Sequence, residues 1–194
     1  MNPVDKIIAD RVSAQKLGDP NADICFLALS LNDQPSLRTL VLRGVNKNGF
    51  TLFVNKTSEK WRILKANNRA QILLWFSSLQ RQYRVNGILE ELEYESLNTN
   101  WAKRPIGSKY LDHAYTHFER QSMPIDSHAS LIHHIHDFKQ KNSEESLDTP
   151  KTAAVLSLIP NEIEMLDLND PDRLHDRRLF KKYHDDWITS QLMP

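Results

Sequence analysis

The chain of 194 residues carries 25 Lys and Arg residues against 25 Asp and Glu residues, so its formal net charge is zero. This balance lacks the basic excess typical of nucleic-acid-binding domains, and we expect no nucleic-acid partner. No apolar run reaches the ~18 residues of a membrane-spanning helix, so we expect no membrane partner. The single cysteine, Cys25, excludes an internal disulfide. The first residues lack the apolar core of a signal peptide, which favours a cytoplasmic location.

Apolar periodicity and turn residues predict the elements in chain order. An amphipathic helix is expected at 4–17, and a short helix is expected to begin after Ser58 and to end near residue 65. Strands are predicted at 24–31, 37–45, 50–55, 70–76 and 82–91. A helical region follows at about 94–141, and strands return at 153–159, 162–168 and 173–180.

Strands, a helical insert and further strands predict an α+β protein, mainly β, with an antiparallel barrel or sandwich and helices packed outside. The connections are too short and too hairpin-like for parallel βαβ units. Gly49 ends a favourable hairpin turn because glycine tolerates positive φ. The chain has only 5 glycines and no glycine-rich phosphate loop. We therefore expect no Rossmann or P-loop nucleotide site.

Three side chains that can carry positive charge fall within five residues near the C-terminus, at Arg173, His175 and Arg177. In an extended strand they would share one face and form a row of roughly 13 Å, because residues two apart point the same way. Arginine binds phosphate and other anions through a planar fork of donors. The alternative is a solvated edge strand whose charges deter aggregation.

A second candidate anion site lies where a predicted strand runs into a helix, around Ser58 and Lys60. Free backbone N–H groups, the positive end of the helix dipole, a hydroxyl and an ammonium group all favour an anion there. The alternative is a capped surface helix with scattered lysines. Upstream, Arg38 and Arg43 flank an apolar strand, and in a regular strand they would point to opposite faces.

Six motifs occur in a characteristic order between about residue 4 and the C-terminus. They are Arg38-Thr39-Leu40-Val41-Leu42; Gly49-Phe50 with Asn55, Ser58 and Lys60; Leu79-Gln80-Arg81-Gln82; Arg104-Pro105 with Ser108; Gln121-Ser122; and Arg173-Leu174-His175-Asp176-Arg177 with Trp187, Leu192 and Pro194. In this order they resemble the pyridoxamine 5′-phosphate oxidase family of FMN-binding split barrels. The closing block is the most specific to the oxidases within that group of folds.

The resemblance implies an antiparallel split β-barrel with flanking helices that binds FMN. It implies one domain over 1–194, with a barrel core at about 4–92, a helical region at 94–141 and C-terminal strands at 151–194. The implied protein is a homodimeric oxidase. It would transfer a hydride from a small-molecule substrate, pyridoxamine or pyridoxine 5′-phosphate, to FMN, with O2 as the acceptor. In such enzymes the flavin supplies the chemistry, and the protein supplies position and electrostatics.

The resemblance also implies a role for particular residues. The implied FMN-binding residues are Arg38, Thr39, Leu40, Val41, Phe53, Val54, Ser58, Lys60, Gln82, Gln121, Ser122 and Arg177. The implied substrate-binding residues are Arg43, Arg104, Ser108, Arg173 and His175. Arg38 and Lys60 would bind the FMN phosphate, while Gln121 and Ser122 would reach the flavin across a dimer. No residue is assigned a catalytic role, and no metal site is expected.

Several positions depart from the family pattern. Glu59 replaces an arginine beside the cofactor phosphate, where a carboxylate would repel the anion unless it turned outward. Asn100 replaces a tyrosine of the substrate-phosphate site, and Leu166 replaces a tryptophan that stacks on the flavin. These departures keep two alternatives open. One is a related FMN-binding oxidoreductase of the flavin reductase type with another substrate, and the other is a non-catalytic FMN-binding protein.

Overall fold

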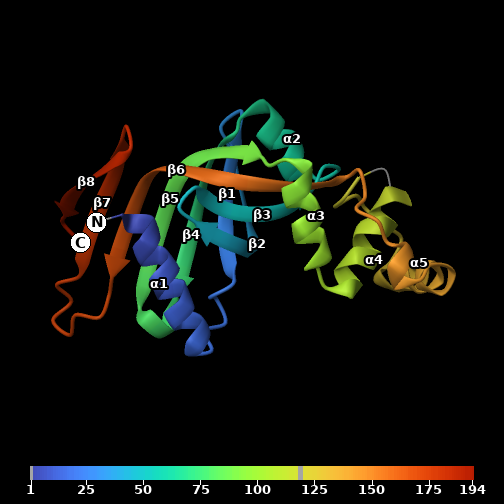
Figure 1. Cartoon of the computed structure of the whole chain (residues 1–194), viewed down its shortest axis with the longest axis horizontal. Coiled ribbons are helices and arrows are strands. Elements are labelled where there is room, and N and C mark those ends of the chain that lie inside the picture. The colour runs from blue at the N-terminus through green and yellow to red at the C-terminus, as the bar shows by residue number, and fades with distance from the viewer. Residues whose placement is uncertain (1, 118–119) are drawn as a thin grey trace. The chain divides into compact units, whose positions relative to one another are not determined.

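A computed structural model describes residues 2–117 and 120–194 of the chain (Figure 1). The described residues form two compact units, and each is considered by itself below. Unit 1 comprises Met1–Leu52, Ala66–Glu90 and Leu156–Pro194, and unit 2 comprises Phe53–Lys65 and Glu91–Val155. The assignment of the whole chain to one domain stays a prediction.

Eight strands form one sheet in the order β3-β2-β1-β4-β5-β6-β7-β8. They are β1 (Ile24–Leu31), β2 (Gln34–Asn46), β3 (Gly49–Asn55), β4 (Arg69–Phe76), β5 (Arg81–Glu91), β6 (Ala153–Asp167), β7 (Asp176–Tyr183) and β8 (Asp186–Leu192). An additional pairing between β3 and β6 closes the first six strands into a barrel. This arrangement confirms the predicted antiparallel split barrel.

The barrel core comes from the alternation of buried side chains along each strand. On β4, for example, Ile72 and Leu74 are fully buried while their neighbours are partly exposed. Cys25 on β1 belongs to the same core and is 0% exposed. Gly87 marks a close approach of β5 to β6, because a Cβ atom there would lie 2.2 Å from the carbonyl oxygen of Ile159. Only glycine fits at this position without a shift of the backbone.

Helix α1 (Pro3–Lys16) packs against β2 and β4 in unit 1 (Figure 1). It begins where the Asn2 side chain accepts a hydrogen bond from the backbone N–H of Val4 at 3.0 Å, and proline follows at the first helical position. Arg11 fastens the helix to the sheet, since its guanidinium donates to the carbonyl oxygens of Ala22 and Leu42, each at 3.0 Å. None of the helices in the described parts of the chain is long and apolar enough to cross a membrane.

A partly buried ionic cluster joins α1 to the ends of two strands. Nη1 of Arg81 donates to both carboxylate oxygens of Asp10 at 2.9 Å, and Nε of Arg81 donates to Asp167 at 3.0 Å. The Tyr83 hydroxyl also donates to Asp10. Burial alone would raise the pKa of Asp167, but hydrogen bonds from Arg81 and Asn169 outweigh it and hold that pKa below its ordinary value.

Unit 2 contains four α-helices. They are α2 (Glu59–Ala66), α3 (Tyr94–Ala102), α4 (Ile106–Ala114) and α5 (His128–Lys141). Trp101 anchors α3, because its ring is 5% exposed and its Nε1 donates to the carbonyl oxygen of Leu147 at 2.9 Å. The same ring stacks on Phe53 with centroids 6.2 Å apart. The helical region predicted at about 94–141 is thus confirmed, and it contains three separate α-helices, α3, α4 and α5.

The boundary between two predicted strands was wrong, and one strand was missed. The segment predicted as two strands, 153–159 and 162–168, is one continuous strand, β6. Pro160 removes one backbone donor from this strand but is compatible with its extended conformation. Strand β8 was not predicted, because its side chains are mostly exposed and show no apolar alternation.

The ionic cluster yields a prediction about stability and pH. Asp167→Asn should lower the free energy of unfolding by about 1–3 kcal/mol near pH 7, because it removes a charge that Arg81 binds. The contribution of a carboxylate with a lowered pKa is present above its ordinary pKa of 3.8 and is lost as the pH falls through the folded-state pKa. Urea unfolding should therefore show the difference between variant and wild type shrinking below about pH 4.

The matched control for this measurement is Asp185→Asn, which removes a carboxylate from the exposed turn between β7 and β8. It should leave the unfolding free energy unchanged. A wild-type advantage over Asp167→Asn that stayed constant down to about pH 3 would show that the Asp167 charge does not support the fold.

Candidate functional site

A polar pocket of about 300 Å³ in unit 2 opens where β3 ends and α2 begins. Asn55 shapes this turn, since its Oδ1 accepts hydrogen bonds from the backbone N–H and from the hydroxyl of Thr57, both at 2.8 Å. The Ser58 hydroxyl donates to the Asn55 carbonyl oxygen at 2.6 Å and accepts from the backbone N–H of Trp61 at 3.4 Å. Ser58 therefore contacts the first turn of α2, as the sequence predicted.

The opposite wall of the pocket comes from a segment more than sixty residues later in the chain. The backbone N–H of Gln121 donates to the Thr57 hydroxyl at 3.1 Å, and Lys60 Nζ donates to the Gln121 side-chain oxygen at 3.2 Å. Ser122 lines the same pocket. Four residues implied as FMN ligands, Ser58, Lys60, Gln121 and Ser122, thus lie close together in one chain. That Gln121 and Ser122 reach the flavin across a dimer stays a prediction.

Two arginines add positive charge to this pocket. Arg62 and Arg120 both line it, together with the single carboxylate of Glu59. In the part of the chain that the structure describes, neither guanidinium group has a hydrogen-bonding or ionic partner. Guanidinium, hydroxyl and amide donors at the start of a helix suit a phosphate group. The arginines offset the charge that Glu59 brings in place of the family's arginine.

Arg104 occupies a second polar position in unit 2, just before α4. Its guanidinium lies over the Phe53 ring, 4.4 Å from the ring centroid, and its Nε donates to the carboxylate of Asp112. Ser108 lies in the first turn of the same helix and is half-buried. The two residues implied as ligands of the substrate phosphate therefore flank the beginning of α4.

The predicted residues of unit 1 on β2 do not share one face. Thr39 and Val41 pair with Phe26 and Ile24 of β1 and lie on the outer side of the barrel. Arg38 pairs with Leu27, whose side chain is buried, and its guanidinium donates to the Ser36 hydroxyl. Leu40 alternates with Thr39 and Val41, and so lies on the same side as Arg38.

Arg43 lies in a β-bulge, where the pairing of β2 with β3 shifts between Leu42 and Gly44. The expectation that Arg38 and Arg43 point to opposite faces assumed a regular strand. A bulge adds one residue to one strand and re-aims its side chains, so that spacing argument does not apply here.

A charged row crosses β5, β6 and β7 on the outer side of unit 1. Glu164 is 8% exposed, and its two oxygens contact Arg177 Nε at 3.0 Å and Arg84 Nη2 at 3.3 Å. Gln82 lies two residues before Arg84 on β5, so both side chains share this face. The structure thus places two implied FMN ligands, Gln82 and Arg177, on neighbouring parts of one sheet face.

The predicted row of Arg173, His175 and Arg177 along a single strand was wrong. β7 begins only at Asp176, and Arg173 has a φ of 62°, in the left-handed region. The side chain of Asp170 causes this turn, because its Oδ1 accepts from two backbone N–H groups that follow it. His175 lies next to the strand, and its Nδ1 is buried with no hydrogen-bond partner among the residues that the structure describes.

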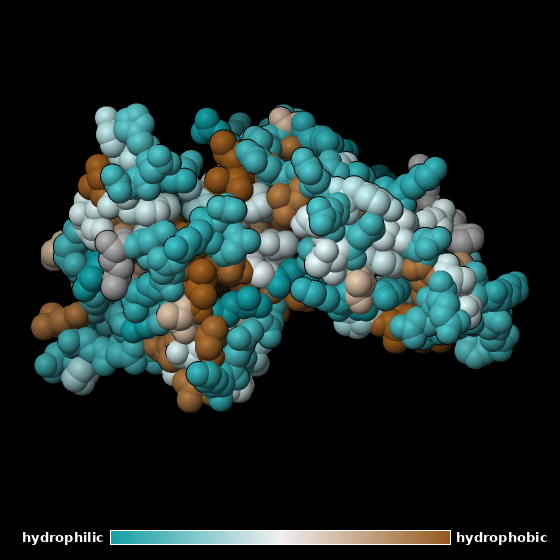
Figure 2. All heavy atoms as spheres, in the orientation of Figure 1, coloured by the Kyte–Doolittle hydropathy of each residue, from teal (hydrophilic) through white to brown (hydrophobic). Residues whose placement is uncertain are grey.

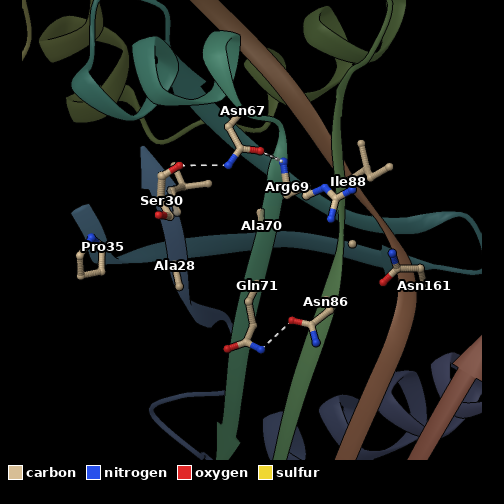
Figure 3. Close-up of a pocket in the computed structure, with 12 residues that line it drawn as sticks. Ala28, Ser30, Pro35, Asn67, Arg69, Ala70, Gln71, Asn86, Ile88 and Asn161 are labelled. Atoms are coloured by element: carbon tan, nitrogen blue, oxygen red, sulfur yellow. Dashed lines mark hydrogen bonds between the residues drawn. The ribbon is translucent and has the colours of Figure 1, made fainter. Parts of the chain in front are cut away.

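A cavity of about 560 Å³ in unit 1 has none of the predicted site residues in its lining (Figure 3). Several of its polar side chains already have hydrogen-bond partners within the protein. Gln71 donates to Asn86 at 2.6 Å, and Asn67 donates to the Ser30 carbonyl oxygen at 3.1 Å. A groove whose polar groups are already paired offers few unmet hydrogen bonds to a ligand.

Comparison with known proteins identifies the family. A family model described as pyridoxamine 5′-phosphate oxidase matches residues 16–142. The chain is 30% identical over 201 residues to a pyridoxine/pyridoxamine 5′-phosphate oxidase of Pelagibacter ubique, covering 100% of this chain and 92% of that protein. A protein of the same name from Burkholderia ambifaria is 32% identical, over 93% of this chain and 83% of its own length. The chain belongs to the pyridoxamine 5′-phosphate oxidase family.

Membership of the pyridoxamine 5′-phosphate oxidase family confirms the predicted relationship and the prediction of an oxidoreductase enzyme. Two solved structures share the fold. PhzG from Burkholderia lata 383 has a TM-score of 0.88 at 22% identity, covering 100% of this chain and 93% of that chain. A pyridoxamine 5′-phosphate oxidase-related, FMN binding protein from Nostoc punctiforme has a TM-score of 0.81 at 16% identity, covering 100% and 99%. At these identities the likeness shows the fold alone.

The sequence did not single out Arg62, Arg120 or Asp112, which the structure places beside predicted site residues. Arg62 follows Ser58 by four residues, one helical turn, so its position beside the helix start could have been found from the spacing. Arg120 directly precedes Gln121, which the resemblance implied as an FMN ligand. Nothing in the sequence signals that Asp112 contacts Arg104, because the contact depends on the path between α3 and α4.

Proposed function

We propose that this member of the pyridoxamine 5′-phosphate oxidase family is an FMN-dependent oxidase. Its proposed substrate is pyridoxamine or pyridoxine 5′-phosphate, and O2 is the proposed electron acceptor. The observation that carries the proposal is the pocket at the start of α2, where hydroxyl, amide and guanidinium donors gather as a phosphate requires. Family membership supports the reaction class.

The chemistry of this pocket fits the phosphate of FMN. Ser58, Lys60, Gln121 and Ser122 would bind it, with Arg62 and Arg120 adding charge. The remaining residues proposed for FMN are Arg38, Thr39, Leu40, Val41, Phe53, Val54, Gln82 and Arg177. When bound, FMN supplies the ring that accepts a hydride and passes electrons on to O2.

The chain's own residues would bind and orient the substrate. Arg104 and Ser108 would bind its phosphate, while Arg43, Arg173 and His175 would contact the rest of the molecule. The buried Nδ1 of His175 has an unmet hydrogen bond among the described residues, which a polar group of the substrate would satisfy. A histidine in this role orients the substrate, since the hydride leaves toward the flavin.

We also propose a homodimer. The outer side of β1 and β2 presents apolar side chains, including Leu37 at 69% and Val41 at 48% exposure. Figure 2 shows hydrophobic side chains at the surface of the strand-bearing region among hydrophilic ones. An isologous dimer is the commonest way to cover such a face.

Sedimentation of the wild type should give twice the chain mass at micromolar concentration. Leu37→Glu should shift the protein toward the monomer, because it places a charge on the apolar face. A monomeric wild type would contradict the proposal.

The charge balance of the α2 pocket gives a prediction for FMN affinity. Lys60→Ala should weaken FMN binding about 10- to 150-fold, because it removes a charge-assisted contact. Glu59→Arg should tighten binding, because it replaces a repulsive charge beside a dianion with an attractive one. Flavin fluorescence titration measures both. Glu145→Arg makes the same charge change outside the pocket lining and serves as control. Equal affinities in all the variants would remove this pocket from the FMN site.

The reaction is tested by mixing the FMN-loaded protein with excess pyridoxamine 5′-phosphate without oxygen. We expect the flavin absorbance to fall, and admission of O2 to restore it with formation of hydrogen peroxide. Reduction by NADH or NADPH but not by the amine would favour the flavin reductase alternative, which Asn100 and Leu166 support. An FMN-loaded protein that none of these compounds reduces would favour the non-catalytic alternative.

A further inference from the structure

Asp112 is a buried carboxylate that is not among the residues proposed to bind FMN or substrate. It is 3% exposed and lies near the end of α4. Burial of a carboxylate is costly unless a charged or hydrogen-bonding partner compensates it. Asp112 accepts a hydrogen bond from Arg104 Nε, and this contact compensates part of the cost of burying the carboxylate.

The guanidinium group of Arg104 makes two contacts within the protein, and the edge formed by its two terminal nitrogens makes none among the described residues. Its guanidinium face lies on the Phe53 ring at 4.4 Å, and its Nε is bound by Asp112. The terminal nitrogens Nη1 and Nη2 have no hydrogen-bond partner within residues 2–117 and 120–194. Because the guanidinium group is planar, fixing its face and its Nε also fixes the direction of the two terminal groups.

We propose that Asp112 is a positioning residue that orients Arg104 for the substrate phosphate. Nη1 and Nη2 of Arg104 form the fork that binds the phosphate, and the Ser108 hydroxyl adds a donor one helical turn away. Asp112 contacts no substrate itself. It removes the cost of ordering a long, flexible side chain at the moment of binding. The inference rests on the proposed function, because that function assigns the phosphate to Arg104 and Ser108.

Two substitutions separate orientation from charge. In D112A nothing accepts the Nε proton, so Arg104 keeps its full charge but loses its fixed direction. In D112N the amide oxygen still accepts that proton, while the negative charge beside the guanidinium is gone. A purely electrostatic role for Asp112 predicts that both variants bind phosphate more tightly than the wild type, because a competing anion has been removed. A positioning role predicts that only D112A weakens binding.

The test measures equilibrium binding of pyridoxal 5′-phosphate and of pyridoxal to the FMN-loaded protein by dialysis. We expect D112A to weaken pyridoxal 5′-phosphate about 2- to 12-fold, the cost of ordering one flexible side chain, and to leave pyridoxal unchanged. D112N should bind the phosphorylated compound at least as tightly as the wild type. In an R104A background, D112A should cause no further loss, since its effect passes through Arg104.

Flavin content and thermal unfolding identify a variant that has failed to fold. If D112A is lost, D112L replaces it, because leucine has a similar volume and also lacks an acceptor for the Nε proton. Equal weakening of pyridoxal and pyridoxal 5′-phosphate in D112A would overturn the inference, since it would mean a general structural role. A D112N variant that binds the phosphate as poorly as D112A would also overturn it. A wild type with no preference for the phosphorylated compound, yet reduced by pyridoxamine 5′-phosphate, would overturn it while the proposed oxidase activity survived.

Discussion

The arrangement of unit 1 depends on Arg81, a cation held between two carboxylates. Asp10 comes from α1 and Asp167 from the last residue of β6, so one side chain at the start of β5 ties together three distant parts of the chain. Removal of Arg81 would leave two carboxylates without their shared cation in a partly buried place, which would cost more than the lost contacts themselves. The raised pKa of the neighbouring Tyr83, caused by burial and by Asp10, keeps that hydroxyl protonated as a donor to the cluster.

The residues of the candidate site in unit 2 lie in turns and at the beginning of a helix, and not in the middle of helices or strands. Asn55 stabilises the turn after β3 by accepting a hydrogen bond from the backbone N–H of Thr57. Thr57, just before α2, in turn accepts a hydrogen bond from Gln121, far along the chain. Rigid elements set the positions, while polar side chains at their ends supply the donors. The same division holds at α4, where Arg104 precedes the helix and Asp112 lies within it.

Much of the fold followed from local pattern, and the errors have physical causes. β1 was predicted from the continuous apolar run that contains Cys25, Leu27 and Leu29, whereas β8 has no apolar run and no buried face to impose a period. The turn at Arg173 depends on the Asp170 side chain, which accepts backbone hydrogen bonds and so favours a turn over an extended strand. The two-residue spacing of Arg173, His175 and Arg177 does not reveal this effect. Among the site residues, the resemblance marked Lys60 and Gln121. Their contact across sixty-one positions could not be read from the sequence, since it is set by tertiary packing.

Cys25 gives the barrel a built-in reporter. It is the only thiol in the chain, it is completely buried on β1, and burial raises its pKa to about 12. A thiol-specific reagent reacts with the thiolate, so the closed protein resists labelling both sterically and chemically. The rate of labelling would therefore report how often β1, a strand of the closed barrel, becomes exposed. It would separate local unfolding of α5, which carries no thiol, from loss of the barrel itself.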